Sequence, residues 1–148
     1  QYEQFISVSM DRQIDDQVLA GSLDPSRARD VLTAQLGKML PRGLETPGHE
    51  FFAIESVATG DQVGDLWFTT MKRAGREVGF VMDIQIHDKY RRHGYGTAAF
   101  DAIERLAIEK GLDEMTLHVA GHNTPARALY LKIGYRELSV SMAKKLNH

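Results

Sequence analysis

Apolar residues in the first part of the chain recur every three to four positions, which is the spacing of an amphipathic helix. This spacing predicts a helix over about residues 2–20. A second helix is predicted to start at Asp24-Pro25, because Asp can cap the first turn and Pro suits the first helical position. It is expected to run to Leu40 and to be ended by the Pro- and Gly-containing segment 41–48.

Beyond the second helix the pattern changes to alternation of apolar and polar residues, which predicts β-strands. Two strands are expected over residues 50–57 and 62–71, and the Thr-Gly-Asp sequence at 59–61 predicts a hairpin between them. A turn at 72–76 leads into a central strand over 77–87. One face of this strand is strongly apolar and carries Phe80, Met82, Ile84 and Ile86.

A helix over 96–110, ended by Gly111, and a strand over 115–120 are predicted to follow the central strand. A strand, a helix and a strand of these lengths form a right-handed crossover, so the two strands are expected to be parallel.

The last part of the chain predicts one more helix and one more strand. The helix is expected over 126–133, started by the Asn-Thr-Pro sequence at 123–125 and stopped by Gly134. Alternating apolar residues over 138–142 predict the final strand.

Composition narrows the class of protein. The chain has 148 residues, of which 43% are hydrophobic and 26% charged. This length is enough for one globular core and too short for two domains of ordinary size. A net charge of -2 with scattered basic residues argues against a nucleic-acid partner. The absence of Cys excludes disulfides and a cysteine nucleophile and fits a reducing cytoplasm, and no apolar run reaches the length of a membrane span. Because the chain begins at Gln1, a preceding segment could have been removed.

The stretch 83–97, D-I-Q-I-H-D-K-Y-R-R-H-G-Y-G-T, joins the central strand to the next helix through a basic, glycine-containing turn. Glycines let the backbone come close to a ligand, and a helix N-terminus directs free N–H groups and the positive end of the dipole at one point. This turn therefore predicts a site for a phosphate group.

From about Val63 to Lys144 the chain resembles the GNAT (GCN5-related) N-acetyltransferases. Their signature Q/R-x-x-G-x-G/A is matched by Arg91, Gly94 and Gly96. Their N-x-x-A-x-x-L-Y-x-K-x-G-F pattern is also matched, with Tyr as the closing aromatic, by Asn123, Ala126, Leu129, Tyr130, Lys132, Gly134 and Tyr135. Each motif alone is weak, whereas their order, spacing and strand-helix context together are specific.

The resemblance implies one α/β (α+β) domain over 1–148, with a helical acceptor-side segment at 1–48 and an acetyl-CoA-binding core at 50–148. Its sheet is expected to be mixed and mostly antiparallel, with a parallel, splayed central strand pair and flanking helices. Family members begin with a strand, so the first strand is expected to be truncated or absent here, and one of the two closing strands is expected to be lost or minimal.

The resemblance also implies acetyl-CoA as the acetyl donor. Its pantetheine arm is expected to pair with the main chain of the central strand, and its pyrophosphate to lie at the turn. The residues implied in cofactor binding are Ile84, Gln85, Ile86, Arg91, Arg92, His93, Gly94, Tyr95, Gly96, Thr97 and Asn123. A second interpretation of Asn123 is that it caps the helix behind it.

Acetyl transfer from a thioester to an amine requires a neutral amine and a proton for the leaving thiolate. Tyr130 occupies the family's general-acid position, and its alternative role is packing on the last helix. The candidate bases are His118, which stands where related ribosomal-protein acetyltransferases have Glu, Asp83, and water. For His118 the alternative is a structural histidine. For Asp83, a carboxylate bound to backbone or to an arginine, or one that attracts the acceptor ammonium, is favoured over the base.

Two other kinds of site are not expected. His118 and His122 are spaced as on a helix but span a strand end and a loop without a third ligand, so no metal site is predicted. The basic cluster at 91–93 lacks interleaved aromatics and a wider basic surface, which argues against nucleic acid.

The predicted function is thus a cytoplasmic acetyl-CoA-dependent N-acetyltransferase that acts directly on a primary amine of a small molecule, peptide or protein. The alternative is a non-catalytic acyl-CoA-binding sensor or regulatory module of the same fold. The loop at 40–49 could wall the acceptor site near Trp67 and Phe68. The sequence does not identify the amine and leaves a homodimer open.

Overall fold

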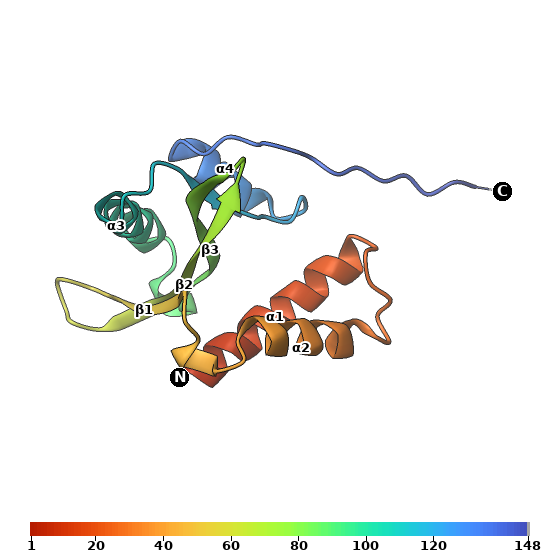
Figure 1. Ribbon diagram of the computed structural model, residues 1–148, viewed down its shortest axis with the longest axis horizontal. Coiled ribbons are helices and arrows are strands. Elements are labelled where there is room, and N and C mark those ends of the chain that lie inside the picture. The colour runs from red at the N-terminus through yellow and green to blue at the C-terminus, as the bar shows by residue number, and fades with distance from the viewer. Residues whose placement is uncertain (148) are drawn as a thin grey trace. The chain divides into compact units, whose positions relative to one another are not determined.

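The computed structural model describes residues 1–147 (Figure 1). It divides into two compact units, Gln1–His118 and Val119–His148, and the described part of the second ends at residue 147. The first unit contains the sheet and three α-helices, and the second contains one helix and the C-terminal segment.

The first unit opens with two helices, as predicted. Helix α1 spans Tyr2–Leu19 and helix α2 spans Ala28–Met39. A short 3₁₀ helix, η1 (Gly43–Glu45), follows. The predicted start of α2 at Asp24 was wrong, because the Asp24 carboxylate accepts hydrogen bonds from the main-chain N–H (2.9 Å) and the hydroxyl (2.8 Å) of Ser26. This local turn uses the capping group before the helix begins.

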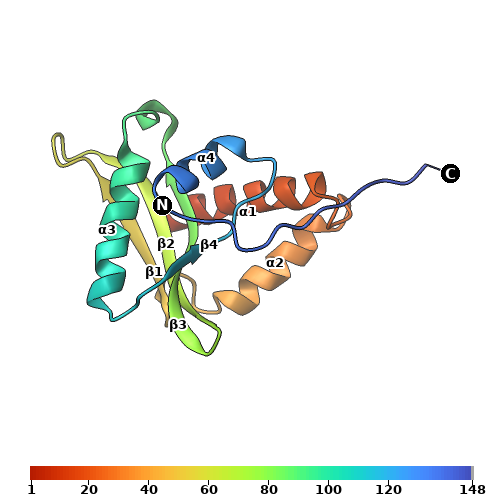
Figure 2. The ribbon, with the colours of Figure 1, turned by 90° about the horizontal axis from the view of Figure 1, so that it is seen from above.

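Four strands form one sheet in the order β1-β2-β3-β4 (Figure 2). Strands β1 (His49–Glu55), β2 (Gln62–Arg73) and β3 (Arg76–Ile86) are antiparallel neighbours. Strand β4 (Met115–Leu117) pairs with β3 in parallel, which confirms the predicted mixed sheet. Strand β4 ends before the predicted residue 120, since its register with β3 stops at Leu117.

The turn between β2 and β3 is shorter than the predicted 72–76. Both central residues, Ala74 and Gly75, have positive φ angles, 52° and 78°. Two consecutive positive φ angles are typical of a two-residue hairpin turn whose twist matches the strands. The two long strands therefore run on to Arg73 and from Arg76.

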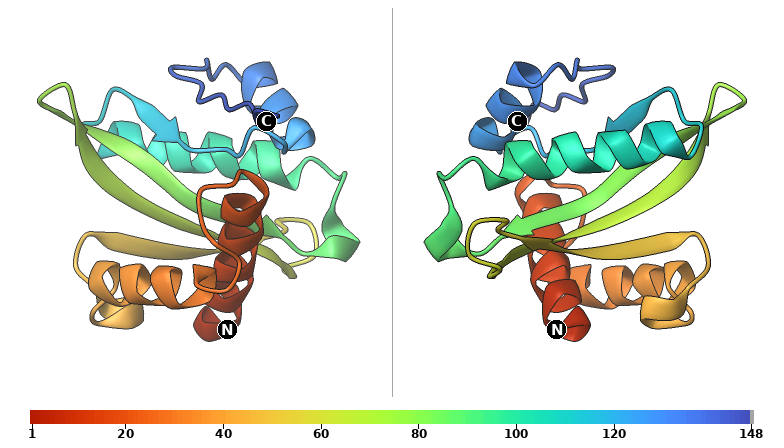
Figure 3. Two further views of the ribbon diagram at one scale, coloured as in Figure 1. Left: turned by 90° about the vertical axis from the view of Figure 1, so that its right-hand side faces the viewer. Right: turned by 90° about the vertical axis from the view of Figure 1, so that its left-hand side faces the viewer.

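Helix α3 (Tyr95–Glu109) carries the chain from β3 to β4. It packs on one face of the sheet through Phe100, Ile103 and Ala107, whereas α1 and α2 cover the other face (Figure 3). On the α1/α2 face a buried cluster forms around Phe5, Leu40 and Trp67. The sheet is thus covered by helices on both faces.

The second unit consists of helix α4 (Thr124–Lys132) and the segment that follows it. Asn123 caps α4, and Gly134 has a φ of 107°, a left-handed conformation that suits glycine just after a helix. The predicted strand over 138–142 was wrong: residues 135–147 have no regular structure, and Leu138, Val140 and Met142 are exposed. A strand requires hydrogen-bonding partners, which alternation alone does not supply.

Candidate functional site

Strand β3 is paired on both edges only in its middle. Its pairing with β4 covers Gly79 to Val81 and stops there, whereas its pairing with β2 continues to Ile86. Within the described residues, the stretch from Met82 to Ile86 therefore has no strand on the β4 side. The family resemblance implied a splayed central strand pair, and the end of the pairing at Val81 leaves an edge that can accept an extended ligand.

Two main-chain groups near this edge form hydrogen bonds with side chains of the protein. The Ile84 N–H donates to Asp83 Oδ1 at 2.8 Å, and the Ile86 carbonyl accepts from Arg91 Nε at 3.1 Å. The His87 N–H, by contrast, donates to the Val63 carbonyl at 2.8 Å, on the β2 side. Since main-chain groups alternate along a strand, Ile84 and Ile86 present theirs to the open edge.

A β-bulge lies opposite Trp67. Trp67 is in register with Asp83 and Phe68 with Val81, so Met82 is the extra residue of β3. A bulge re-aims the side chains of its strand. Met82 and Asp83 are neighbours in sequence, yet both face the helical layer: Met82 lines a pocket with α1 and α2, and Asp83 binds Arg12 of α1.

The Asp83 carboxylate is held by three donors. Arg12 Nη1 lies 2.6 Å from Oδ1, the Ile84 N–H donates to the same oxygen, and Gln85 Nε2 donates to Oδ2 at 3.1 Å. The Gln85 amide also donates to the main-chain carbonyl of Phe5 at 3.0 Å. The Asp83 side chain is only 10% exposed. These contacts tie α1 to the open end of β3.

The turn after β3 begins with the 3₁₀ helix η2 (Asp88–Tyr90) and leads into α3. Arg91 pairs with Asp88 at 3.2 Å, and His93 Nδ1 lies 2.7 Å from the Arg91 carbonyl oxygen. The side chains of Arg91, Arg92 and His93 are exposed, as is that of Thr97. Cationic groups thus stand around the start of α3.

Gly94 is the N-cap of α3 and has a φ of 81°, a conformation that side chains other than glycine rarely adopt. No side chain caps the first turn. A Cβ atom built on Gly94 would meet no protein atom within 4 Å. The first turn of α3 thus has no side-chain cap, and its N–H groups lie at the positive end of the helix dipole, as a phosphate site requires.

Tyr95 and Gly96 open α3 and are both partly buried. The Tyr95 hydroxyl donates to Ser56 Oγ at 3.3 Å, and its ring contacts those of Tyr90 and His93, each with a centroid distance of 6.2 Å. These contacts anchor the turn to the hairpin between β1 and β2. The Tyr95 side chain therefore stabilises the turn, whereas the backbone at Gly94 is exposed.

The remaining predicted site residues lie later in the chain. His118 is exposed and directly follows β4. Asn123 Oδ1 accepts from the Ala126 N–H at 3.3 Å, so its capping role is confirmed. Tyr130 lies on α4, where its ring makes an edge contact with that of Tyr135 at 6.2 Å. Asn123 and Tyr130 belong to the second unit.

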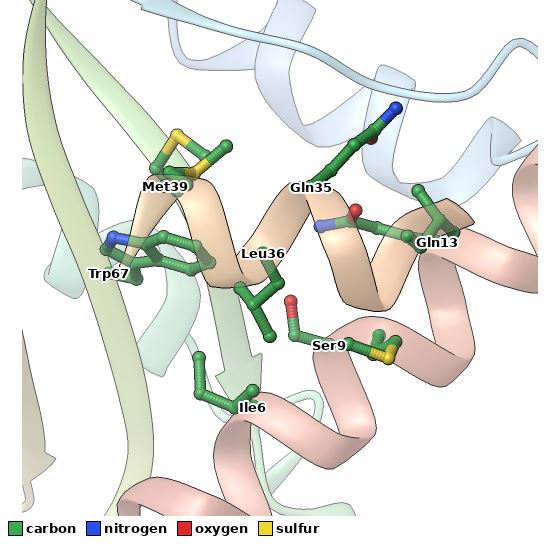
Figure 4. Close-up of a pocket in the computed structure, with 10 residues that line it drawn as sticks. Ile6, Ser9, Gln13, Gln35, Leu36, Met39 and Trp67 are labelled. Atoms are coloured by element: carbon green, nitrogen blue, oxygen red, sulfur yellow. The ribbon is translucent and has the colours of Figure 1, made fainter. Parts of the chain in front are cut away.

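A small pocket of about 70 Å³ opens between α1, α2 and the bulged part of the sheet (Figure 4). Trp67 lies at one end, and the amide side chains of Gln13 and Gln35 lie at the other. None of its lining residues is ionisable at neutral pH: they are Ile6, Ser9, Met10, Gln13, Leu32, Gln35, Leu36, Met39, Trp67 and Met82. The pocket shares Met82 with the open part of β3.

The Trp67 side chain is held in place by a histidine and a phenylalanine. Trp67 Nε1 donates to His49 Nδ1 at 3.0 Å, and Trp67 stacks on Phe51 with a centroid distance of 5.3 Å. Burial lowers the pKa of His49 below its ordinary value near 6.5. Because Nδ1 accepts this hydrogen bond, His49 is neutral when the bond is made.

Two further findings concern residues 1–147. No cluster of three or more metal-ligating side chains lies among them. None of their helices is both long enough and apolar enough to cross a bilayer.

The chain is similar in sequence to known acetyltransferases. The sequence model of the acetyltransferase (GNAT) family matches residues 24–135. The chain is also 31% identical over 146 residues to the uncharacterized N-acetyltransferase YycN of Bacillus subtilis (strain 168), covering 99% of this chain and 93% of that protein. The chain belongs to the GNAT acetyltransferase family. Its general reaction is acetyl transfer, and family members generally use acetyl-CoA.

Solved structures agree with this assignment. The crystal structure of YycN from Bacillus subtilis has a TM-score of 0.86 at 32% identity, covering 100% of this chain and 96% of that chain. The aminoglycoside 6'-N-acetyltransferase AAC(6')-Ih of Acinetobacter baumannii has a TM-score of 0.57 at 19% identity, covering 79% and 80% of the two chains. The second likeness shows the GNAT fold alone. The family and fold predicted from the sequence are thus confirmed.

Several site features were not visible in the sequence. The favoured interpretation of Asp83 as a carboxylate bound to backbone or to an arginine is confirmed, but the sequence did not identify the arginine as Arg12, which lies 71 residues away. The sequence predicted a role for the Gln85 main chain in binding the donor. It did not predict that the buried Gln85 side chain links β3 to α1. The pocket at Met82 depends on a bulge, for which the alternating pattern gives no signal.

Proposed function

We propose that this GNAT protein transfers the acetyl group of acetyl-CoA directly to a primary amine. The open edge of β3 from Met82 to Ile86, which leads directly into the uncapped N-terminus of α3 at Gly94, carries this proposal. A strand edge suits an extended amide-containing arm, and a helix N-terminus suits a pyrophosphate. Acetyl-CoA contains both groups in one molecule.

The residues present fit this donor. The exposed guanidinium groups of Arg91 and Arg92 provide positive charge beside the turn, and a Cβ added to Gly94 would meet no protein atom within 4 Å. Ile84 and Ile86 would exchange their contacts with Asp83 and Arg91 for contacts with the arm. Arg91 would then be free to face the pyrophosphate.

The arm has a definite end on this strand. It would extend from the turn back along β3, past Ile86 and Ile84, until it reached the point where β4 pairs with β3 at Val81. The thioester is therefore expected near Met82. The chemistry that acetyl-CoA supplies is an activated acetyl group on a good leaving thiolate.

Three tasks remain for the protein: to accept the amine, to remove its proton, and to protonate the leaving thiolate. We assign the last task to Tyr130, because a phenol with an ordinary pKa of about 10 is protonated at neutral pH and can give its proton to a thiolate. His118, exposed just after β4, is our first choice as base, acting on the amine directly or through water.

Asp83 is better suited to positioning than to proton transfer. Its two oxygens already accept hydrogen bonds from Arg12, Ile84 and Gln85. A base must present its carboxylate to the amine, whereas the Asp83 side chain is only 10% exposed and is paired with the Arg12 guanidinium at 2.6 Å. We therefore propose that Asp83 orients the strand that binds the donor.

The test combines donor binding with thiol release. Titration calorimetry with acetyl-CoA measures donor binding, and release of free CoA is then followed with a panel of amines. Binding followed by amine-dependent thiol release supports the proposal. Binding without thiol release from any amine would support the sensor or regulatory module instead, and absence of binding would contradict both. A cytoplasmic location and a homodimer stay predictions.

A further inference from the structure

The pocket beside Met82 has the size and chemistry of a side-chain site. Its volume is about 70 Å³, enough for a compact group of a few heavy atoms. Its sheet end is formed by Trp67 and Met82, and α1 and α2 add Ile6, Leu36 and Met39. Methionine side chains adapt readily to a ligand, so this lining suits a small aliphatic or thioether group.

The pocket carries no charge that could hold a cationic ligand. Its polar lining residues are Ser9, Gln13 and Gln35, all neutral. The nearby carboxylate of Asp83 is already paired with Arg12 at 2.6 Å. Transfer of a second ammonium or a guanidinium into such a pocket would lose hydration without a partner charge, so polycationic acceptors are disfavoured.

The two glutamine amides indicate what accompanies the apolar group. Gln13 on α1 and Gln35 on α2 lie at the end of the pocket away from Trp67, and both are exposed at its rim (Figure 4). An amide side chain both donates and accepts hydrogen bonds. Such a pair matches a peptide group, which also presents one N–H and one C=O.

The reacting amine must also be neutral for attack. An α-amine has an ordinary pKa of about 7.7–8.0, whereas a lysine-type amine has one of about 10.4. Near neutral pH an appreciable fraction of an α-amine is already uncharged, while an aliphatic amine requires strong assistance. The pocket lining adds no ionisable group to the one base that we propose, His118.

We propose that the acceptor is the α-amine of a peptide or amino-acid amide whose first side chain is compact, apolar and uncharged. That side chain occupies the pocket between α1, α2 and Met82, and the following peptide group meets Gln13 and Gln35. In the reaction the amine nitrogen forms a bond to the acetyl carbon, the carbon–sulfur bond of the thioester breaks, and one amine proton is transferred in net terms to the CoA thiolate. This inference rests on the proposed acetyl transfer and adds its substrate class.

The test compares leucinamide with glycinamide, which lacks the side chain, and with cadaverine and kanamycin, which are cationic. We expect kcat/KM to be roughly tenfold or more higher for leucinamide than for glycinamide, because the isobutyl group is buried. Cadaverine and kanamycin should be poorer still. Equal or better rates with either cationic amine would overturn the proposal.

Three variants locate the effect. Met39 is 40% exposed at the pocket, and Met71 is 43% exposed at the far end of β2, so Met39→Trp and Met71→Trp form a matched pair. Met39→Trp should abolish the preference for leucinamide over glycinamide, and Met71→Trp should leave it unchanged. Ile6→Ala, which enlarges the pocket, should shift preference toward phenylalaninamide. A preference that survives Met39→Trp and is unmoved by Ile6→Ala would overturn the proposal.

A binding measurement separates this inference from the reaction itself. Calorimetry with leucinamide and glycinamide in the presence of CoA reports occupancy of the pocket without chemistry. Leucinamide binding that Met39→Trp abolishes, with no thiol release from any amine, would support the side-chain pocket and contradict the proposed acetyl transfer. Thiol release with amines, but no binding advantage of leucinamide, would keep the acetyl transfer and overturn the substrate class.

Discussion

Arg12 of α1 and Asp83 of β3 form an ion pair with a distance of 2.6 Å between Nη1 and Oδ1. The pair joins the helix that lines the pocket to the strand that bears the open edge. Because Asp83 also accepts the Ile84 N–H, the same carboxylate fixes both the helix and a main-chain donor of that edge. The positions of the pocket and the edge are therefore coupled through one side chain.

A double-mutant cycle with Arg12→Met and Asp83→Asn tests this coupling. Asp83 is 10% and Arg12 39% exposed, so solvent screens the pair in part. We expect a coupling free energy of about 1 kcal/mol in denaturant unfolding, larger than the value for a fully exposed pair. The exposed pair of Arg29 with Asp11, examined by the same cycle with Arg29→Met and Asp11→Asn, serves as control.

The same Asp83→Asn variant distinguishes positioning from proton transfer. If Asp83 positions β3, kcat should fall modestly and the pH dependence of kcat/KM should keep its shape. Loss of the basic group from that profile, with an unchanged fold, would instead make Asp83 the base.

Tyr130→Phe should reduce turnover by about a hundredfold or more while the affinity for acetyl-CoA is kept, since only the proton donor is lost. Tyr135→Phe is the matched control, because Tyr135 contacts the Tyr130 ring and also lies in the second unit. The measurement is single-turnover thiol release together with calorimetry. An unchanged rate under conditions where chemistry limits turnover would remove Tyr130 from the mechanism.

For the base, the pH–rate profile of His118→Ala is compared with that of His122→Ala. We expect the limb of the profile assigned to the base to disappear in His118→Ala and to persist in His122→Ala. A profile of His118→Ala that matches the wild type would assign the base to another group or to water.

His49 provides a prediction that concerns pH and stability. Its folded pKa lies below the ordinary 6.5, so the unfolded state binds more protons as the pH falls below that value. The stabilisation from neutral His49 is fully present above about pH 6.5 and is lost as the pH falls through the lower folded pKa. Titration of the His49 ring by NMR should give a pKa under 6.5, and the Trp67 Nε1–H signal should move with it, since the two are hydrogen-bonded. A His49 pKa at or above the ordinary value would contradict the burial of this ring.

Much of the fold could be predicted from local pattern. The alternation of Phe80, Met82, Ile84 and Ile86 predicted β3, and the spacing of apolar residues predicted α3, because each pattern requires only neighbours along the chain. The same reasoning failed at 138–142, where alternation was present but no partner strand exists among the described residues. It also failed at Asp24, where a local turn with Ser26 displaced the helix cap.

The donor side of the candidate site could be predicted from the sequence better than the acceptor side. The turn at Gly94 could be recognised from its glycines together with the second motif at 123–135, and the observed φ of 81° at Gly94 is one that glycine adopts readily. The acceptor side was not predictable, because it depends on a bulge at Met82 and on contacts between α1 and β3 that lie far apart in sequence. Such contacts are specified by packing and leave no periodic signal.

We propose that the start of α3 holds the pyrophosphate of acetyl-CoA. Gly94 and Gly111 offer a matched test, since they have φ angles of 81° and 84°, flank opposite ends of α3, and have no protein atom within 4 Å of an added Cβ. Replacing either with Ala should cost a similar stability of about 1 kcal/mol, because each forces a side chain into the left-handed region.

Only one of the two substitutions should affect the donor. In titration calorimetry with acetyl-CoA, Gly94→Ala should weaken binding by about tenfold or more, because its methyl group enters the space before the first-turn N–H groups and disturbs their hydrogen bonds. Gly111→Ala should bind as the wild type does. If Gly94→Ala instead binds acetyl-CoA with wild-type affinity, the donor does not lie at this turn and the account is contradicted.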